Sequence, residues 1–242
     1  MAATNAESKP TWTAQGDEKR GLVQRMFAEI APSYDRCNAL ASLGLHHRWR
    51  AFAATRLSCK GSDRVLDLCC GTGDFLTPLR SIVGTSGTLL GMDFCEPMLV
   101  SASAKDPHAK LGLADACCLP IRKNQLDGVS VGWGIRNVPD IDQAHREAFR
   151  VLKPGKKFVS LDMARPKNAV VRFFARGITN NLLPLMGALF GKREAYTYLP
   201  QSTDRFLDRD ELKTSMERAG FVDVHYKDLF LGNICVHWGT KP

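Results

Sequence analysis

Apolar and polar positions follow two different periods along this chain, and their alternation predicts a repeated order of strands and helices. Short runs rich in Val, Ile and Leu between polar or glycine residues indicate strands, and apolar steps of three and four indicate helices. The predicted strands are Arg64–Leu68, Thr88–Met92, Lys110–Ala114, Gly128–Trp133, Lys157–Asp162, Val222–Phe230 and Ile234–Trp238. The predicted helices are Glu18–Ala31, His46–Leu57, Asp74–Val83, Glu96–Ala104, Asp140–Leu152 and Asp208–Ala219.

This order predicts an α/β fold with a doubly wound, Rossmann-like sheet of about seven strands. The last two strands flank Gly232-Asn233, which predicts a hairpin and therefore an antiparallel C-terminal edge. Asp17 is placed to cap the first helix, and Pro32 should stop it. We expect a single domain over residues 17–242, preceded by a disordered tail over residues 1–16.

Composition narrows the class of protein. The chain has 242 residues, 44% of them hydrophobic, which suits one large core. No apolar stretch reaches the ~20 residues of a membrane span, and residues 1–16 lack the apolar core of a signal peptide, so we expect a cytoplasmic protein. The eight cysteines include the adjacent pairs Cys69-Cys70 and Cys117-Cys118, a poor arrangement for chelating one metal. We therefore expect no metal site and reduced, mostly buried thiols.

The formal net charge of +8 is concentrated in one segment. Between Met163 and Arg193 there are six basic residues and no acid. The apolar positions of this segment trace one helical face, at Val171, Phe174, Ile178, Leu182, Leu185 and Leu189. We expect a helical lid inserted at about 163–205, which either only covers the core or also contacts an anionic membrane surface peripherally, on its inner face. No pattern of an RNA reader occurs elsewhere, so nucleic acid is not an expected partner.

The run from Val65 to Phe75 holds the strongest chemical signal. An apolar strand carries Asp67 near its end, and a loop with Gly71 and Gly73 follows. Glycines let the backbone approach a ligand closely. Asp93 ends the next strand, twenty residues after Gly73, where an acid is placed to bind both hydroxyls of a ribose. After the third strand come Asp115 and Ala116, where an adenine edge could sit.

Two nucleotide-binding motifs are absent from this loop, and their absence narrows the choice of nucleotide. The dinucleotide pattern would need glycine where Leu76 stands, and no phosphate loop with Gly-Lys-Ser/Thr follows. A lining rich in acids suits the cationic S-adenosylmethionine better than an anionic cofactor. An NAD-type nucleotide or a purely structural turn remains the alternative.

Arg136 and Asn137 follow the end of the fourth strand, on the part of the crevice where an acceptor would sit. Their alternative role is structural, as an ion-paired arginine and a capping asparagine. Tyr34, near the end of the first helix, could fold over the cofactor, or be an ordinary buried tyrosine.

Five motifs give the chain a family resemblance. It resembles the ubiquinone/menaquinone biosynthesis C-methyltransferases, which are class I S-adenosylmethionine-dependent enzymes, from about Met26 to Trp238. The motifs are Ala31-Pro32-Ser33-Tyr34-Asp35, the run Leu66 to Asp74, Gly134-Ile135-Arg136-Asn137-Val138, the run Arg150 to Gly155, and Tyr198-Leu199-Pro200-Gln201-Ser202. The Gly-Ile-Arg-Asn-Val run is specific to this family, whereas the glycine loop occurs in many methyltransferases. One departure is Gly132, where family members often have serine.

The resemblance implies methyl transfer to a ring carbon of a polyprenylated quinol, either demethylmenaquinol or a ubiquinone precursor. It implies cofactor contacts at Thr72, Asp93, Asp115 and Ala116, and catalytic roles toward the acceptor for Tyr34, Arg136 and Asn137. The alternatives are another lipophilic or small acceptor, or a cofactor-binding partner without activity. The oligomeric state, monomer or homodimer, stays open.

An arginine cannot be the general base for the phenol, because its own pKa exceeds ~12. It can stabilise the phenolate. The candidate bases are Asp162, His46 and His47.

Overall fold

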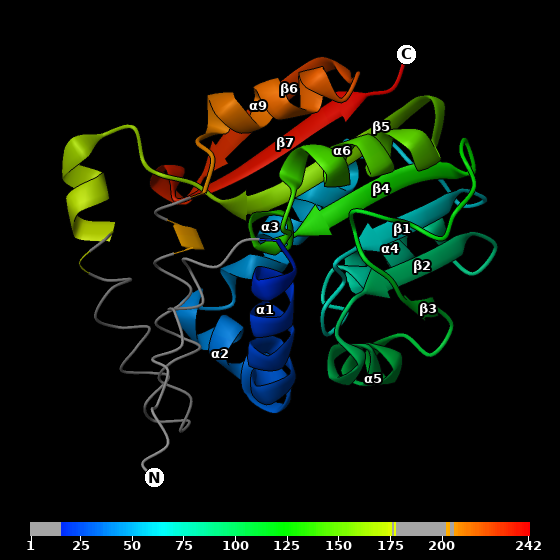
Figure 1. Ribbon diagram of the computed structural model, residues 1–242, viewed down its shortest axis with the longest axis horizontal. Coiled ribbons are helices and arrows are strands. Elements are labelled where there is room, and N and C mark those ends of the chain that lie inside the picture. The colour runs from blue at the N-terminus through cyan, green and yellow to red at the C-terminus, as the bar shows by residue number, and fades with distance from the viewer. Residues whose placement is uncertain (1–15, 176, 178–201, 204–205) are drawn as a thin grey trace, which may run out of the picture.

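The computed structural model describes residues 16–175, 177, 202–203 and 206–242. Its centre is a seven-stranded sheet in the order β3-β2-β1-β4-β5-β7-β6 (Figure 1). The strands are β1 Arg64–Leu68, β2 Thr88–Asp93, β3 Lys110–Leu113, β4 Leu126–Gly132, β5 Leu152–Met163, β6 Val222–Leu229 and β7 Ile234–Thr240. β1 to β5 are parallel, and β7 runs antiparallel to β5 and β6. The predicted fold class and the antiparallel edge are confirmed.

Helices cover both faces of this sheet. They are α1 Gly16–Ile30, α2 Tyr34–Ala41, α3 Leu45–Arg56, α4 Leu76–Val83, α5 Glu96–Lys105, α6 Ile141–Val151 and α9 Arg209–Arg218. Because successive strand residues point to opposite faces, β1 contributes side chains to two hydrophobic cores, one on each face of the sheet. Leu66 and Leu68 pack with α6 and α9, while Val65 packs with α3 and α4. The helix α1 lies apart from both layers, across the carboxyl ends of the strands (Figure 1).

Several helix boundaries differ from the prediction. Asp17 lies inside α1 and not before it. Pro32 does not end the helical segment, because residues 31–33 form a 3₁₀ turn that leads directly into α2, a helix that we did not predict. Proline is well tolerated in the first turn of a helix, where its missing N–H has no partner to lose. The turn places Tyr34 at the start of α2.

Two boundaries next to loops also differ. The helix after the glycine loop begins at Leu76, two residues later than predicted, so Asp74 belongs to the loop. The helix α6 ends at Val151, because Leu152 already pairs with Leu126 as the first residue of β5.

The described residues set limits on the remaining predictions. The predicted tail falls outside them except for Gly16, and so does most of the predicted lid, of which a helix over 169–175 is described. In the described part of the chain, no helix is long and apolar enough to span a membrane. All eight cysteines lie within it as free thiols. No cluster of three or more His, Cys, Asp or Glu in this part could hold a metal ion.

Candidate active site

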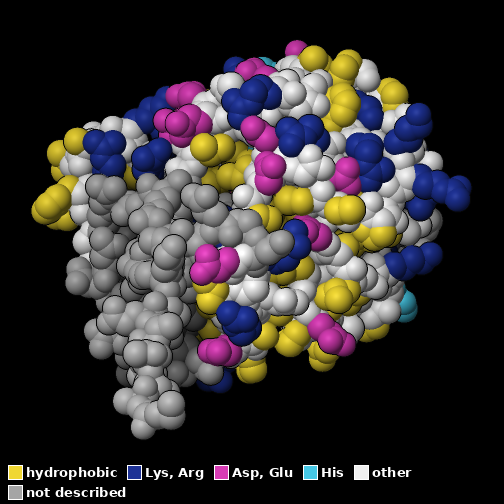
Figure 2. Space-filling model, viewed as in Figure 1, with side chains coloured by type: hydrophobic (Ala, Val, Ile, Leu, Met, Phe, Trp, Pro, Cys, Tyr) yellow, Lys and Arg dark blue, Asp and Glu magenta, His cyan; other side chains and the backbone are white. Residues whose placement is uncertain are grey.

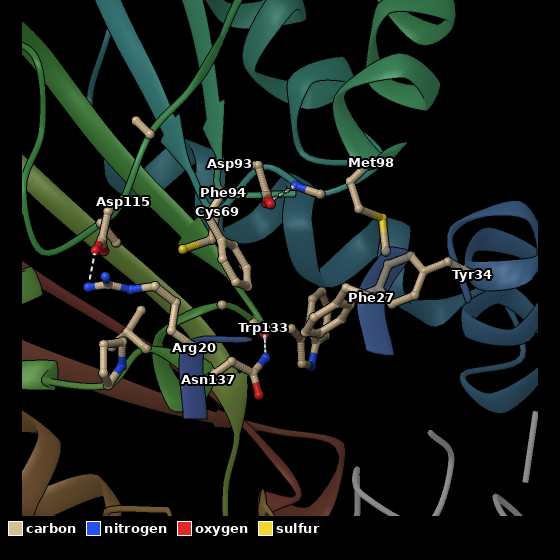
Figure 3. A pocket seen from close by; sticks show the side chains of 17 residues that line it. Arg20, Phe27, Tyr34, Cys69, Asp93, Phe94, Met98, Asp115, Trp133 and Asn137 are labelled. Atoms are coloured by element: carbon tan, nitrogen blue, oxygen red, sulfur yellow. Dashed lines mark hydrogen bonds and ion pairs between the residues drawn. The ribbon is translucent and has the colours of Figure 1, made fainter. Parts of the chain in front are cut away.

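A pocket opens at the carboxyl ends of β1, β2 and β4, beneath α1 (Figure 3). Six residues predicted from the sequence line it: Tyr34, Gly71, Asp93, Asp115, Ala116 and Asn137. Other lining residues were not predicted, among them Arg20, Phe27, Cys69, Phe94, Met98 and Trp133. The pocket therefore combines two acids, Asp93 at the end of β2 and Asp115 after β3, with aromatic and apolar side chains, among them those of the N-terminal helices and the β4 turn.

Asp93 fixes the glycine loop while facing the pocket. Its Oδ2 accepts a hydrogen bond from the Gly71 N–H at 2.8 Å, and its Oδ1 accepts one from the Cys95 N–H at 2.9 Å. Burial raises the pKa of this carboxyl, and the backbone N–H groups partly oppose that rise. Gly71 has φ +53°, and a Cβ built there would meet nothing within 4 Å. The space where a side chain would stand is therefore open toward the pocket. Each Asp93 oxygen keeps acceptor capacity for a ribose hydroxyl.

Asp115 is held from two directions. Its Oδ1 accepts a hydrogen bond from the Cys117 N–H at 2.9 Å, and its Oδ2 pairs with Arg20 Nη2 at 2.5 Å (Figure 3). Arg20 belongs to α1, which also reaches the β4 turn through Lys19, whose Nζ donates to the Val138 carbonyl at 2.8 Å. Gln24 Nε2 donates to the Phe94 carbonyl at 2.8 Å. The helix α1 is thus tied to both sides of the pocket.

The turn after β4 forms the other wall. Trp133 has φ +56°, a conformation that L residues other than Asn and Asp rarely adopt. Asn137 Nδ2 donates to the Trp133 carbonyl at 3.1 Å. Opposite this wall, Tyr34 packs edge-on against Phe27, with ring centroids 6.1 Å apart. Tyr34 and Asn137 therefore line the same pocket, and their role toward the acceptor stays a prediction.

Arg136 is not placed as predicted. It is buried, does not line the pocket, and donates from Nη1 to Asp162 and to the Trp133 carbonyl. Burial raises the pKa of Asp162, and Arg136 opposes the rise. Neither Asp162, one candidate base, nor Arg136 faces the acceptor space. The pair instead holds the turn that carries Trp133 and Asn137.

Asp67 lies beneath the pocket and not in its lining. It is buried, and its Oδ1 accepts a hydrogen bond from Ser130 Oγ at 2.9 Å. Burial raises the pKa of Asp67 to about 7.

The second glycine of the loop has a different role from the first. Gly73 has φ +84°, and a Cβ there would lie 3.0 Å from Ala102 Cβ in α5. A side chain at Gly73 would therefore strain the backbone and meet the helix α5. The glycine permits close packing of the loop on α5.

Thr72 is buried behind the loop in a polar network. Its hydroxyl donates to Asp35 Oδ1 of α2, and Lys105 Nζ donates to it at 3.2 Å. Lys105 also pairs with Asp74 and, at 2.6 Å, with Asp35 Oδ2. The loop is thus joined to α2 and α5 through side chains, and Thr72 does not line the pocket.

Arg50 of α3, which was not predicted, links the glycine loop to the turn after β4. Its Nη2 lies 3.4 Å from Asp74 Oδ2 in the glycine loop, and its guanidinium lies 4.5 Å from the centroid of the Trp133 ring. His46, another candidate base, is buried beside Arg50, and burial lowers its pKa to about 4. It is therefore neutral, and its Nδ1 accepts a hydrogen bond from Arg50 Nη1.

A local sequence signal for this wall existed. Glycines flank Trp133 on both sides, and both make close approaches. A Cβ at Gly132 would lie 2.9 Å from Phe75 Cδ1, and one at Gly134 would overlap Cys69 Cβ. Glycines on either side of an aromatic residue at a strand end indicate a tight backbone approach.

The fold and the acid-lined pocket define an S-adenosylmethionine-dependent methyltransferase of class I. The chain belongs to the ubiE/COQ5 methyltransferase family, whose model matches residues 13–241. In fold, it resembles an S-adenosylmethionine-dependent methyltransferase from Thermotoga maritima, with a TM-score of 0.66 and 19% identity, covering 90% of this chain and 99% of that one. It also resembles the [4+2]-cyclase SpnF, with a TM-score of 0.65 and 15% identity over 91% and 95% of the two chains. This second likeness shows that the fold alone does not fix the reaction.

Relatives in sequence are similar over nearly their whole length. The demethylmenaquinone methyltransferase of Lactiplantibacillus plantarum is 37% identical, covering 90% of this chain and 95% of its own. That of Desulfitobacterium hafniense is 38% identical, over 94% and 92%. The 2-phytyl-1,4-naphtoquinone methyltransferase of Synechocystis is 40% identical, over 84% and 89%.

Proposed function

We propose that this protein transfers a methyl group from S-adenosylmethionine to a ring carbon of demethylmenaquinol. The observation that carries the proposal is the pocket itself, in which an acid-lined half adjoins an aromatic half within a chain of the ubiE/COQ5 family. Each of the three relatives named above carries a name that specifies a menaquinone or naphthoquinone substrate. This favours a naphthoquinol over the benzoquinol ring of a ubiquinone precursor.

The residues present fit the cofactor. A sulfonium donor supplies a methyl group that needs no further activation. Asp93 offers its two oxygens to ribose hydroxyls, the open side of Gly71 admits the ligand, and Asp115 lies where a base edge would be read. The carboxylates also provide negative charge near a cation, which strengthens binding in a partly dry pocket.

On the acceptor side, Trp133 offers an aromatic face to a flat ring. Asn137 and Tyr34 can orient the quinol hydroxyl or a water molecule that removes its proton. A phenol of pKa ~10 must lose its proton to push charge onto the adjacent carbon. We propose that Arg136 acts on this step through its hold on the Trp133 carbonyl, as a positioning residue.

The test uses purified protein, S-adenosylmethionine and chemically reduced demethylmenaquinol with a short tail. The expected product is the ring-methylated quinol, identified by mass and fragmentation. A matched ubiquinone precursor is the comparison acceptor. Methylation of the benzoquinol alone would overturn the choice of ring, and no methylation of either would overturn the proposed function.

A second proposal concerns location. We propose that the protein is cytoplasmic and binds the inner face of the membrane peripherally through the segment 165–175. Val170, Phe173 and Phe174 expose large apolar side chains on its helix, and the same segment carries Arg165, Lys167 and Arg172. Figure 2 shows apolar and basic side chains together at this end of the molecule. Apolar and basic groups side by side suit the interface of an anionic bilayer.

Each basic residue near such a surface contributes ~1 kcal/mol, and salt weakens the attraction. The protein should therefore co-sediment with anionic vesicles at low salt, less at high salt, and little with neutral vesicles. Equal binding to neutral vesicles at all salt concentrations would contradict the electrostatic part of this proposal.

A further inference from the structure

The tip of the β6–β7 hairpin exposes two large apolar side chains in an unusual backbone conformation. Phe230 is 52% exposed with φ +45°, and Leu231 is 78% exposed with φ +56°. Glycine or asparagine would adopt these angles more easily. Exposed apolar residues in a strained turn indicate a function for the side chains themselves, because burial in a core does not explain the large part of each side chain that faces solvent.

A chain of aromatic contacts connects this tip to the pocket. The rings of Phe230 and Trp49 lie 5.5 Å apart, and those of Trp49 and Trp133 lie 6.3 Å apart. Trp133 is a wall of the pocket. The hairpin tip, the helix α3 and the β4 turn, far apart in sequence, thus form one apolar path from the acceptor space to the surface.

Further apolar residues flank this path, together with Arg50, whose guanidinium lies 4.5 Å from the centroid of the Trp133 ring. Met163 at the end of β5 and Leu229 at the end of β6 are partly buried and pack on the same hydrophobic core as Trp49 and Trp133. The outer end of the path adjoins the start of the basic segment, because a Cβ at Gly232 would lie 3.5 Å from the Cα of Pro166. The path therefore runs from the pocket toward the segment proposed to meet the membrane.

We infer that Phe230, Leu231 and Trp49 form a track for the isoprenoid tail of the acceptor. This inference rests on the proposed function and names residues that select for the tail. An isoprenoid chain has no hydrogen-bonding groups, and it can lie on aromatic faces without leaving polar atoms unsatisfied. A tail that follows this track leaves the quinol ring against Trp133 and its distal end beside the lipid surface.

The experiment compares demethylmenaquinol carrying one isoprene unit with demethylmenaquinol carrying several, both in detergent micelles. The test variants are Phe230→Asn and Leu231→Asn, since asparagine tolerates a positive φ. The matched control is Leu43→Asn, at a leucine that is 82% exposed with φ +50° and has no place in the aromatic path. Each test variant should lower kcat/KM for the long-tail acceptor roughly tenfold or more, as expected for lost apolar contacts in a pocket. The short-tail acceptor and the control variant should change little.

Two further measurements separate a tail track from other roles. Titration calorimetry with S-adenosylhomocysteine should give unchanged affinity, and thermal unfolding should show that both variants are folded. If both variants keep the wild-type ratio of long-tail to short-tail kcat/KM, the track is wrong. If that ratio is unchanged in detergent but vesicle binding falls, the tip is a lipid contact and the inference is also overturned. Wild-type protein that methylates neither acceptor would instead refute the proposed function.

Discussion

The cofactor half and the acceptor half of the pocket are built by different means. In the cofactor half, backbone N–H groups of Gly71 and Cys95 hold the carboxylate of Asp93, and glycine provides the open surface. In the acceptor half, Arg136, Asn137 and Arg50 hold the carbonyl and ring of Trp133. The acid of the cofactor half is therefore held by backbone N–H groups, whereas the aromatic wall of the acceptor half is held by side chains, one of which, Arg50, comes from α3.

The largest effect should come from the ion pair that supports the acceptor half. Arg136→Ala leaves the buried carboxylate of Asp162 without its partner, which typically costs about 3–5 kcal/mol of folding stability. Urea unfolding followed by circular dichroism measures this loss. The double variant Arg136→Met/Asp162→Leu should regain much of the stability but not the activity, because the Trp133 carbonyl loses its donor. A stable Arg136→Ala variant would show that the pair is not needed to hold the turn.

The next effect should fall on the cofactor half alone. Asp93→Ala removes the acceptor proposed for the ribose and the anchor of the Gly71 N–H, so affinity for S-adenosylmethionine should fall by about 1.5–3 kcal/mol. Titration calorimetry measures the loss. The variant Asp93→Asn keeps one acceptor oxygen and should lose less. Unchanged affinity in Asp93→Ala would remove this residue from the cofactor half.

The buried carboxyl beneath the cofactor half should appear as a dependence of stability on pH. The pKa of Asp67 is raised to about 7 in the folded protein, so the folded state binds a proton that the unfolded state has released between pH ~4 and 7. Its contribution to stability is present below pH ~4 and is lost as the pH rises through 7. Asp67→Asn removes this loss and keeps an oxygen for the Ser130 hydroxyl. The stability of Asp67→Asn relative to wild type should therefore increase from pH 5 to pH 8.

Buried histidines provide an internal check on that measurement. Burial lowers the pKa of His145 to about 3 and that of His237 to about 4, so both destabilise the folded protein as the pH falls below 6.5. Both are present in wild type and in Asp67→Asn, and they cancel in the difference. A difference between the two proteins that does not vary with pH would contradict the perturbed pKa of Asp67.

The smallest effect should come from the contact that joins α1 to the cofactor half. Arg20 and Asp115 form a partly exposed ion pair, and such pairs contribute about 0–1 kcal/mol. Arg20→Gln should therefore change cofactor affinity by no more than about fivefold and should leave the melting temperature nearly unchanged. Titration calorimetry at low and high salt measures the change in cofactor affinity. A much larger change in affinity would mean that Arg20 contacts the cofactor directly.

In each half of the pocket the sequence predicted some of the lining residues and misplaced others, and the reason is physical. A glycine loop between a strand and a helix, with acids at the ends of neighbouring strands, is a local pattern whose geometry follows from the parallel sheet. Asp93, Asp115 and Gly71 accordingly line the pocket. Asp67 and Gly73 belong to the same pattern but do not line the pocket. Asp67 pairs with Gly91 inside the sheet, two residues before the end of β2 at Asp93, and Gly73 packs on α5.

The acceptor half could not be predicted in the same way. Arg136 has the right residue type at the right strand end, yet its guanidinium turns to Asp162, 26 residues later in the chain. Arg50 and Trp49 come from a helix with no chemical motif, and only the tertiary fold brings them to Trp133. The start of α2 after Pro32 was also missed, since the 3₁₀ turn lets one helix lead into another.

The position of α1 across the pocket has a consequence for the synthesis of the protein. Lys19 finds its acceptor at Val138, 119 residues further along the chain. At translation rates of 5–20 residues per second, about 6–24 s pass between the appearance of the two partners. During that interval the apolar residues of α1, such as Val23 and Phe27, have no completed pocket to cover. The helix α1 thus waits for a contact made by a residue 119 positions later in the chain, and in this period a chaperone or a premature contact could most readily capture the nascent chain.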